Sequence, residues 1–342
     1  MIDDPRPVLT LAHSPDPDDV FMWWPITGKI APDGRPLAPP AIETGRFRYR
    51  SIPEDIQVLN RRARDVGDFD ITAISFAAYP GVRERYAITA CGASFGEGFG
   101  PKVVVRDDSR VREMGDLVGR EGVVRLAIPG KQTTACMVLS MVLAEAGDND
   151  TGETPVPRVG RARSVSLVEM AFEKVIPAVA SGEVDAGVVI HEGQVIFEQA
   201  GLRRVVDLGE WWKRRLGLPL PLGANVIRRD LDARFGAGTC GEVERMLSAS
   251  IEYALSHRRE GLEHTVPYAL RNATRSGERS GGVGEPPSLE RIDAYVAMYV
   301  NRWTRGMGVE GAEAVRRLLR AGAEAGLVEA CEVDVVGLDS RA

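Results

Sequence analysis

The chain has 342 residues, of which 44% are hydrophobic and 27% are charged, and its formal net charge at pH 7 is −6. This balance is typical of a globular protein and disfavours a dedicated nucleic-acid binder, because such proteins carry a basic excess. The N-terminus lacks the basic start and apolar stretch of a secretory signal, and no segment approaches the length of a membrane span. We therefore expect a cytoplasmic protein with neither a nucleic-acid nor a membrane partner.

Cysteine and histidine are scarce, which limits the chemistry that the chain can perform. The four cysteines lie far apart and form no CxxC pair, so we expect no disulfide framework and no metal site. Few groups remain for acid–base chemistry near neutral pH. The residues concerned are Cys91, Cys136, Cys240 and Cys331, with His13, His191, His257 and His264.

The first half of the chain alternates between strand-like and helix-like segments, which predicts an α/β fold. The predicted strands cover residues 7–12, 46–52, 69–74, 101–106 and 123–128. Asp18 or Asp19 is predicted to cap a short helix that Pro25 and Gly28 end. Further helices are expected at residues 54–64 and 133–146, with loops at 27–45 and 148–163.

The second half is predicted to become mainly helical after one more pair of strands. A helix over residues 167–180 leads into a strand at 185–190 and a helical run at 194–201. Residues 217–223 are rich in Pro and Gly and are predicted to form a crossover before a strand at 224–227. From Cys240 onward the pattern is helical, interrupted by a mobile loop at residues 271–288.

The order of these elements predicts two domains, as the length also does. We expect residues 1–103 and 223–342 to build one domain and residues 104–222 to build the other. The chain then crosses between domains twice, near residues 101–105 and 219–223. A double crossing with a cleft between lobes is the geometry of hinge-closing binding proteins, and such interfaces are preferred ligand sites.

His191 is the most informative candidate residue, because it directly follows a buried strand. A side chain there lies at the carboxyl edge of the sheet, where ligands bind in open α/β folds. The N-terminus of the following helix is expected to keep the imidazole neutral and able to accept a proton. The alternative is a core histidine satisfied by a backbone carbonyl.

Three other strand ends offer polar groups to the same cleft. Ser14 and Asp18 follow the first strand, Ser75 ends the third strand behind Ala73 and Ile74, and a further polar turn opens the helix at residue 133. There Thr133, Thr134 and Ala135 can present hydroxyl and amide groups to an anionic ligand such as a carboxylate. The alternative for Asp18, Thr133 and Thr134 is that each only caps its helix. His13 could be a second acid–base group, but a histidine at such a place more often orients its loop by a hydrogen bond.

Four polar strand ends in one cleft, one of them with a base, suit an enzyme that removes a proton from a small polar ligand. No GxSxG elbow surrounds Ser75, and the glycines at 96–100 do not open a βαβ helix as a dinucleotide site requires. We therefore expect neither nucleophilic catalysis nor a dinucleotide cofactor.

Ordered motifs along nearly the whole chain resemble a known family. The motifs are Ser14-Pro-x-Pro-x-Asp19, Asp55-Ile-Gln-Val-Leu-Asn60, Pro129-Gly-x-x-Thr-Thr-Ala135, Gly182-Glu-Val-Asp-Ala-Gly187, Ile190-His-Glu192, Asp207-Leu-Gly-Glu-Trp-Trp212 and Leu218-Pro-Leu-Pro-Leu-Gly223. The chain resembles the MqnA/MqnD family of menaquinone-biosynthesis enzymes and, within it, the 1,4-dihydroxy-6-naphthoate synthase branch. The His-Glu motif favours this branch over the chorismate dehydratase branch.

The resemblance implies a two-lobed fold similar to type II periplasmic binding proteins. It implies a lyase of the futalosine pathway that converts cyclic dehypoxanthine futalosine to 1,4-dihydroxy-6-naphthoate without a cofactor. His191 matches the family's proposed general base. Residues 73–75 and 133–135 match its substrate-contacting segments.

The first loop departs from the family pattern, since Asp16, Asp18 and Val20 stand where the family usually has Cys, Asn and Thr. An added carboxylate repels an anionic substrate unless it caps the helix or faces away. An altered substrate therefore remains open, as do two other functions: a solute-binding receptor for a small carboxylate and a chorismate dehydratase-like activity. The sequence does not determine the oligomeric state.

Overall fold

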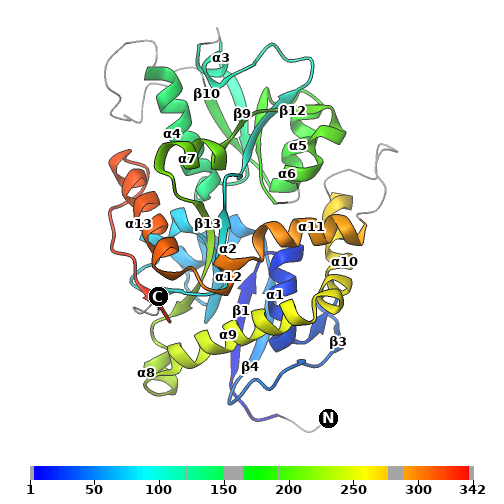
Figure 1. Cartoon of the computed structure of the whole chain (residues 1–342), viewed down its shortest axis with the longest axis vertical. Helices are drawn as coiled ribbons and strands as arrows, with labels where there is room; N and C mark the ends of the chain where they lie inside the picture. The colour runs from blue at the N-terminus through cyan, green and yellow to red at the C-terminus, as the bar shows by residue number, and fades with distance from the viewer. Residues whose placement is uncertain (1–3, 120–121, 149–164, 192, 276–287, 339–342) are drawn as a thin grey trace.

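The computed structural model describes residues 4–119, 122–148, 165–191, 193–275 and 288–338. Two lobes are stacked along the long axis of the molecule, each built around its own β-sheet (Figure 1). We call the lobe with the larger sheet the large lobe and the other the small lobe. Among the described helices, none combines the length and the apolar character that crossing a bilayer requires.

The large-lobe sheet has the strand order β14-β6-β13-β5-β1-β4, and β7 also pairs with β13. β1 is parallel to β4 and β5, whereas β13 is antiparallel to β5, β6 and β7. A separate hairpin joins β2 (Lys29–Ile30) and β3 (Pro36–Ala38). The strands of the large sheet are β1 (Val8–His13), β4 (Arg48–Pro53), β5 (Ile71–Ser75), β6 (Tyr86–Thr89), β7 (Ser94–Gly96), β13 (Leu220–Arg228) and β14 (Val335–Val336).

The small-lobe sheet has the order β10-β9-β11-β8-β12. β9 is parallel to both β10 and β11, while β8 is antiparallel to β11 and β12. The chain enters the small sheet at β8 and returns to the large sheet at β13. Each of these two strands is antiparallel to the strands that it pairs with. The strands are β8 (Lys102–Arg106), β9 (Val124–Ile128), β10 (Val165–Glu169), β11 (Ala186–Val189) and β12 (Leu202–Asp207).

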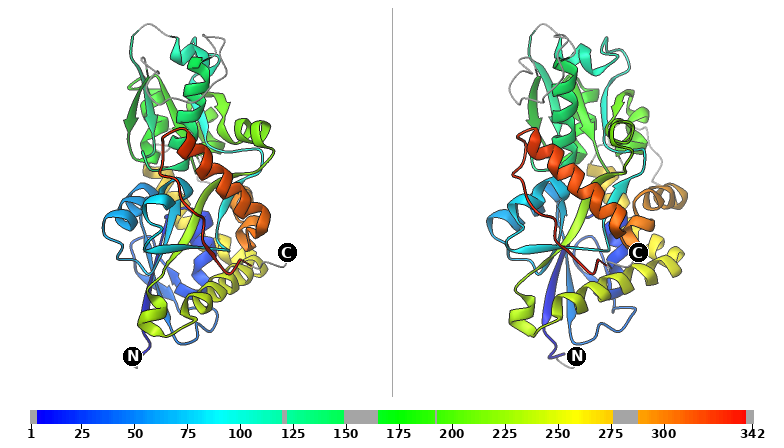
Figure 2. Two further views of the ribbon diagram at one scale, coloured as in Figure 1. Left: turned by 90° about the vertical axis from the view of Figure 1, so that its left-hand side faces the viewer. Right: turned by 60° about the vertical axis from the view of Figure 1, so that its left-hand side comes forward.

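Helices cover the sheets of both lobes (Figures 1 and 2). The large lobe carries α1 (Pro17–Thr27), α2 (Ile56–Asp65), α8 (Leu231–Phe235), α9 (Thr239–Ser256), α10 (Arg258–Arg275), α11 (Leu289–Tyr299), α12 (Arg302–Arg305) and the 3₁₀ helix Phe76–Gly81. The small lobe carries α3 (Met114–Val118), α4 (Thr134–Asp148), α5 (Phe172–Ala180), α6 (Gly193–Ile196), α7 (Leu208–Leu216) and the 3₁₀ helix Phe197–Ala200.

After its first turn, which carries Asp18 and Asp19, helix α1 is apolar on all sides, and this explains its central position in the large lobe. Phe21, Met22, Trp23 and Trp24 are all buried. A helix without a polar face must be enclosed, and α1 packs against α9, α10 and α11 as well as β4. This enclosure holds the start of α1, and with it the loop after β1, at a defined position.

The two lobes share a hydrophobic core through α4 and α13 (Gly308–Glu324). Leu318 of α13 and Leu139 of α4 belong to one cluster that also contains residues of both sheets. Gly322 lies so close to Met137 that a Cβ at this position would be 2.6 Å from its sulfur. The C-terminal helix therefore fastens the small lobe to the large one, as the red helix in Figure 2 shows.

The chain passes between the two sheets twice, before β8 and before β13. The predicted crossover at 217–223 is wrong for residues 220–223, which belong to β13, whereas 217–219 lie outside any helix or strand. β13 begins at Leu220, and Pro221 pairs with Phe95 of β7 where the register shifts. Such a bulge accommodates a proline within a strand. The expected domain boundaries after residues 103 and 222 fall inside β8 and β13, and the division into those two domains stays a proposal.

Two predicted helix limits were wrong: the start of α5 in the small lobe and the end of α10 in the large lobe. Residues 167–169 belong to strand β10, and α5 begins only at Phe172, because Leu167 and Val168 pair with β9. Tertiary pairing here outweighs the local helical pattern. Helix α10 continues to Arg275, past the predicted interruption at 271. Residues 276–287 of that predicted loop lie outside the described residues, and Ser288 is the N-cap of α11. The loop predicted at 148–163 also lies outside them, except Asp148, which ends α4.

The start and end of α1 also differ from the sequence-based prediction. Asp16 is the N-cap residue, so Asp18 and Asp19 lie in the first turn and do not cap the helix. Pro25 is inside the helix, which ends at Thr27 before Gly28. Gly28 adopts a φ of 79°, a conformation that only glycine adopts readily.

The backbone packs closely where the chain first passes from the large lobe to the small one, just before β8, and this packing yields a test of the fold. A Cβ at Gly209, in the first turn of α7, would lie 2.0 Å from the carbonyl oxygen of Phe99. Because backbone atoms cannot easily give way, we expect Gly209→Ala to lower the free energy of unfolding by about 1–3 kcal/mol. Gly306→Ala is the matched control, since no heavy atom lies within 4 Å of that position. Equal denaturation midpoints for the two variants would contradict this packing.

Candidate functional site

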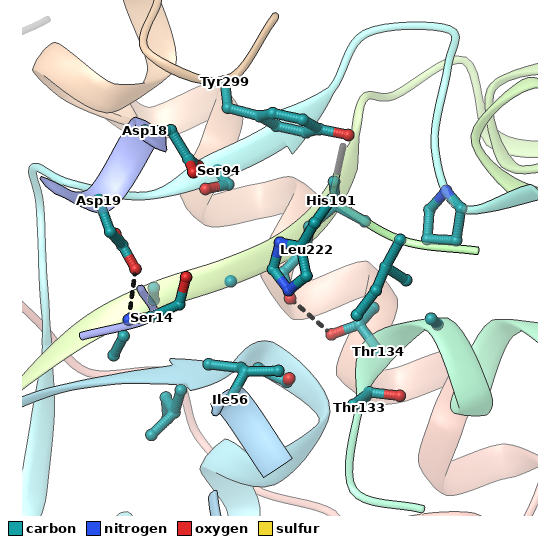
Figure 3. Close-up of a pocket in the computed structure, with 18 of the residues that line it drawn as sticks. Ser14, Asp18, Asp19, Ile56, Ser94, Thr133, Thr134, His191, Leu222 and Tyr299 are labelled. Atoms are coloured by element: carbon teal, nitrogen blue, oxygen red, sulfur yellow. Dashed lines mark hydrogen bonds between the residues drawn. The ribbon is translucent and has the colours of Figure 1, made fainter. Parts of the chain in front are cut away.

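A cavity with an empty volume of about 730 Å³, its mouth included, lies between the lobes. Its walls come from the ends of β1, β5, β9 and β11, together with β13 and α11. All nine site residues predicted from the sequence line it, namely Ser14, Asp18, Ala73, Ile74, Ser75, Thr133, Thr134, Ala135 and His191. The structure therefore brings the four predicted strand ends to one cavity. Figure 3 labels residues from three of them, Ser14, Thr134 and His191.

His191 lies at the cavity wall and contacts a carboxylate from the opposite lobe. Its Nδ1 is 2.9 Å from Oδ2 of Asp16, and its side chain is 20% exposed. The edge of the Phe172 ring packs against the imidazole, with ring centroids 4.9 Å apart. The ring is thus held between the loop after β1 and the start of α5, and it is not an interior histidine.

Asp16 is completely buried beneath this contact. The hydroxyl of Ser14 donates to Oδ2, and the Asn272 amide donates to Oδ1 over 3.1 Å. Burial alone would raise the pKa of Asp16, but the charge and hydrogen bond of His191, with the Ser14 hydrogen bond, hold it below 3.8. The contact with His191 therefore favours the ionised form of Asp16.

The electrostatics of His191 differ from the sequence-based expectation. The following helix, α6, has only 4 residues, so its dipole is small. An ionised carboxylate 2.9 Å from Nδ1 is the stronger influence, and it stabilises a proton on that nitrogen. Asp16 itself is completely buried and does not line the cavity.

Asp18 and Asp19 place two further carboxyl groups at the cavity. The hydroxyl of Tyr295 donates to Asp18 Oδ1 over 3.1 Å, and the Ser14 amide donates to Asp19 Oδ2 over 2.8 Å. Burial, reinforced by the charge of Asp16, raises the pKa of Asp18 to about 6. Burial and the charge of Asp18 raise the pKa of Asp19 well above 3.8. Both groups hold protons more readily than ordinary aspartates.

His13 has a structural position behind the first loop. One ring nitrogen is 2.7 Å from the carbonyl oxygen of Ser14, and the other is 2.6 Å from the hydroxyl of Ser51. Burial lowers the pKa of His13 to about 4, so the ring is neutral. It orients the Ser14 loop, the role that the sequence analysis gave it as the more frequent one.

The hydroxyl groups of the site are already engaged with the protein. Ser75 accepts from the Asn60 amide over 3.1 Å, and its own N–H donates to Asn60 over 2.8 Å. Thr133 accepts from the N–H of Cys136 over 3.2 Å, so it caps α4 as the alternative interpretation held. These bonds fix the cavity wall before any ligand arrives.

Thr134 connects α4 to the large lobe. Its hydroxyl donates to the carbonyl oxygen of Leu222 over 2.8 Å and accepts from the N–H of Ala77 over 3.2 Å. At a helix N-terminus the first amide groups have no intrahelical acceptor. The backbone of Thr134 and Ala135 thus offers N–H donors where these residues line the cavity.

The sequence analysis missed the contribution of α11 and α6. Tyr295 and Tyr299 both line the cavity, and the Gln194 amide donates to the Tyr299 hydroxyl across the cleft. The signal was the spacing of two tyrosines by four residues, which places both on one helix face. Among the described residues, no group of three or more His, Cys, Asp or Glu side chains is arranged to hold a metal ion.

Comparisons with known proteins agree on one family. A family described as menaquinone biosynthesis matches residues 9–324. A 1,4-dihydroxy-6-naphthoate synthase of Thermus thermophilus is 35% identical over 93% of this chain and 95% of its own length. A synthase of the same name from Streptomyces coelicolor is 30% identical over 96% of this chain and 97% of its own length.

Solved structures show the same fold. A protein of Archaeoglobus fulgidus has a TM-score of 0.72 at 31% identity and covers 94% of this chain and 98% of its own. The alkanesulfonate-binding protein of Xanthomonas axonopodis has a TM-score of 0.61 at 13% identity and covers 97% of this chain and 99% of its own. The predicted periplasmic-binding-protein-like fold is confirmed.

The raised pKa of Asp18 predicts how stability depends on pH. Between about pH 4 and 6 the folded state keeps a proton on Asp18 that the unfolded chain loses, so this contribution to stability falls as pH rises. Asp18→Asn removes the titration. Relative to wild type, its free energy of unfolding should therefore rise by up to about 3 kcal/mol from pH 4 to 7. Urea titrations measure this, and a difference that stays constant with pH would contradict it.

Proposed function

Because the chain belongs to the menaquinone-biosynthesis family, we propose that it converts cyclic dehypoxanthine futalosine to 1,4-dihydroxy-6-naphthoate, with His191 as general base. The observation that carries this proposal is the place of His191, at the wall of a cavity between two lobes with a carboxylate on Nδ1. Because the Asp16 carboxylate accepts the proton of Nδ1 in a hydrogen bond, it favours the tautomer in which Nε2 is the basic nitrogen. The proton acceptor of this proposal therefore belongs to a residue that lines the cavity.

The cavity also has donors for an acidic substrate. The amide groups at the start of α4 suit a carboxylate, because they add the positive end of a helix dipole to directed N–H bonds. Thr134 and Ala135 are the residues that we propose for this contact, with Ser14, Asp18 and residues 73–75 as the opposite wall. The raised pKa values of Asp18 and Asp19 reduce the repulsion that two ionised carboxylates would exert.

The proposed reaction begins with proton abstraction by His191, followed by cleavage of a carbon–carbon bond that releases the sugar-derived part. Formation of the aromatic naphthoate makes the sequence of steps favourable. Contacts from both lobes, such as Gln194 with Tyr299, orient the substrate when the cleft is closed.

The test is incubation of the purified chain with cyclic dehypoxanthine futalosine, followed by mass detection of the naphthoate. His191→Asn and His191→Ala should lower kcat by about 10²–10⁴-fold, the usual contribution of a general base, while substrate binding persists. Turnover that is unchanged in both variants would rule out this role for His191.

The same incubation separates the two other functions. Substrate that binds and is recovered chemically unchanged would indicate a solute receptor, whose fold is the same. Consumption of chorismate, assayed in parallel, would indicate a dehydratase. Neither result is expected, because the synthases of Thermus and Streptomyces match over nearly the whole chain.

A further inference from the structure

We propose that Asp16 is a positioning residue for His191: its carboxylate, carried by the large lobe, holds the Nδ1–H of the imidazole carried by the small lobe. The bond sets which ring nitrogen acts as the base and where it points. This inference rests on the proposed function, because it concerns the base of that reaction. It also gives a role to a residue that departs from the family pattern.

The burial of Asp16 supports a positioning role and not a substrate contact. Its side chain is 0% exposed, and it lies behind the cavity wall formed by Ser14, Asp18 and His191. The carboxylate accepts hydrogen bonds from Ser14 and Asn272 in addition to the contact with His191. With donors at both oxygens, the group has little freedom to rotate, so it presents one defined acceptor to the ring.

The backbone of His191 provides a second, independent observation. Its φ is 51°, and it is the one non-glycine residue with positive φ in the described part of the chain. A left-handed conformation at such a residue costs about 1–3 kcal/mol and persists only where the surroundings enforce it. The bond to Asp16 and the edge of Phe172 hold the ring from two sides. The strained backbone thus aims the side chain at Asp16.

The bond joins the two lobes. Asp16 follows β1 of the large sheet, whereas His191 follows β11 of the small sheet. Separation of the lobes would break the contact, so the oriented base exists only while the cleft is closed. Gln194 and Tyr299 make a second polar contact across the same cleft.

Other ionisable groups surround the pair, and Asp16 differs from them by its direct contact with the ring. Asp18, Asp19 and Asp55 interact with the charge of His191, and His13 interacts with that of Asp16. Further ionisable groups in the described part of the chain are Tyr295 and Tyr299 on α11 and Glu173 beside Phe172 on α5. A carboxylate in hydrogen-bond contact raises the pKa of an imidazole, and its removal should lower that pKa by about one unit or more.

The first experiment compares Asp16→Asn with Asp70→Asn by steady-state kinetics against pH. Asp70 is a matched control, since it is a buried aspartate of the same lobe that bonds Thr10 and Arg234 outside the cavity. We expect Asp16→Asn to lower kcat roughly tenfold or more, with a smaller change in KM. The acidic limb of its kcat profile should move to lower pH by about one unit, whereas Asp70→Asn should leave it in place.

The second experiment needs no turnover. Histidine-selective ¹⁵N labelling of the full chain gives signals from only 4 histidines, and His191→Asn identifies the signal of His191. In Asp16→Asn the midpoint of the His191 titration should fall by about one unit or more relative to wild type. Asp16→Ser, a second neutral replacement, serves if Asp16→Asn does not fold.

The outcomes distinguish this inference from the proposed function. An unchanged His191 titration in a folded Asp16 variant, or a kcat profile equal to that of wild type, would overturn the positioning role. An increase in KM with unchanged kcat would overturn it as well, because Asp16 would then act on binding. If the wild-type chain converts no substrate, the proposed function fails, while the nitrogen titration still decides whether Asp16 controls His191.

Discussion

The contact between Nδ1 of His191 and the buried carboxylate of Asp16 is the interaction on which the organisation of this site depends. It requires two lobes that meet, because each partner follows a strand of a different sheet. The chain satisfies this requirement by passing between sheets at β8 and β13 and by packing α13 against α4. The closed cleft and the oriented imidazole are therefore consequences of the same topology.

Most polar groups of the cavity are fixed by the protein itself. Asn60 holds Ser75, Tyr295 bonds Asp18, and Thr134 bonds the carbonyl oxygen of Leu222. A site whose side chains are restrained in advance loses less entropy when it binds and orients a reacting molecule. This rigidity suits a reaction that needs a proton acceptor at a defined place. It also means that several residues of the site have a structural role beside any contact with substrate.

Much of the fold could be predicted from local sequence, and two of the errors share one cause. The strand and helix order, the double passage between sheets and the convergence of strand ends follow from apolar runs bounded by turn residues. Residues 167–169 and 220–223 were assigned incorrectly because their state depends on pairing with β9 and with β7. Such pairing joins segments distant in sequence, so a local pattern carries little information about it.

The sequence by itself determined that Ser75 ends a strand, that His191 follows one, and that the turn at 133–135 opens a helix of an α/β protein. Alternation of apolar and polar residues is a local property, and strand ends in such folds meet at the same side of the sheet. Only the tertiary structure decided that Asp16 faces His191, that Asn60 holds Ser75 and that Tyr299 closes the cavity. These contacts depend on how two lobes and their helices pack, and packing is a property of the whole chain.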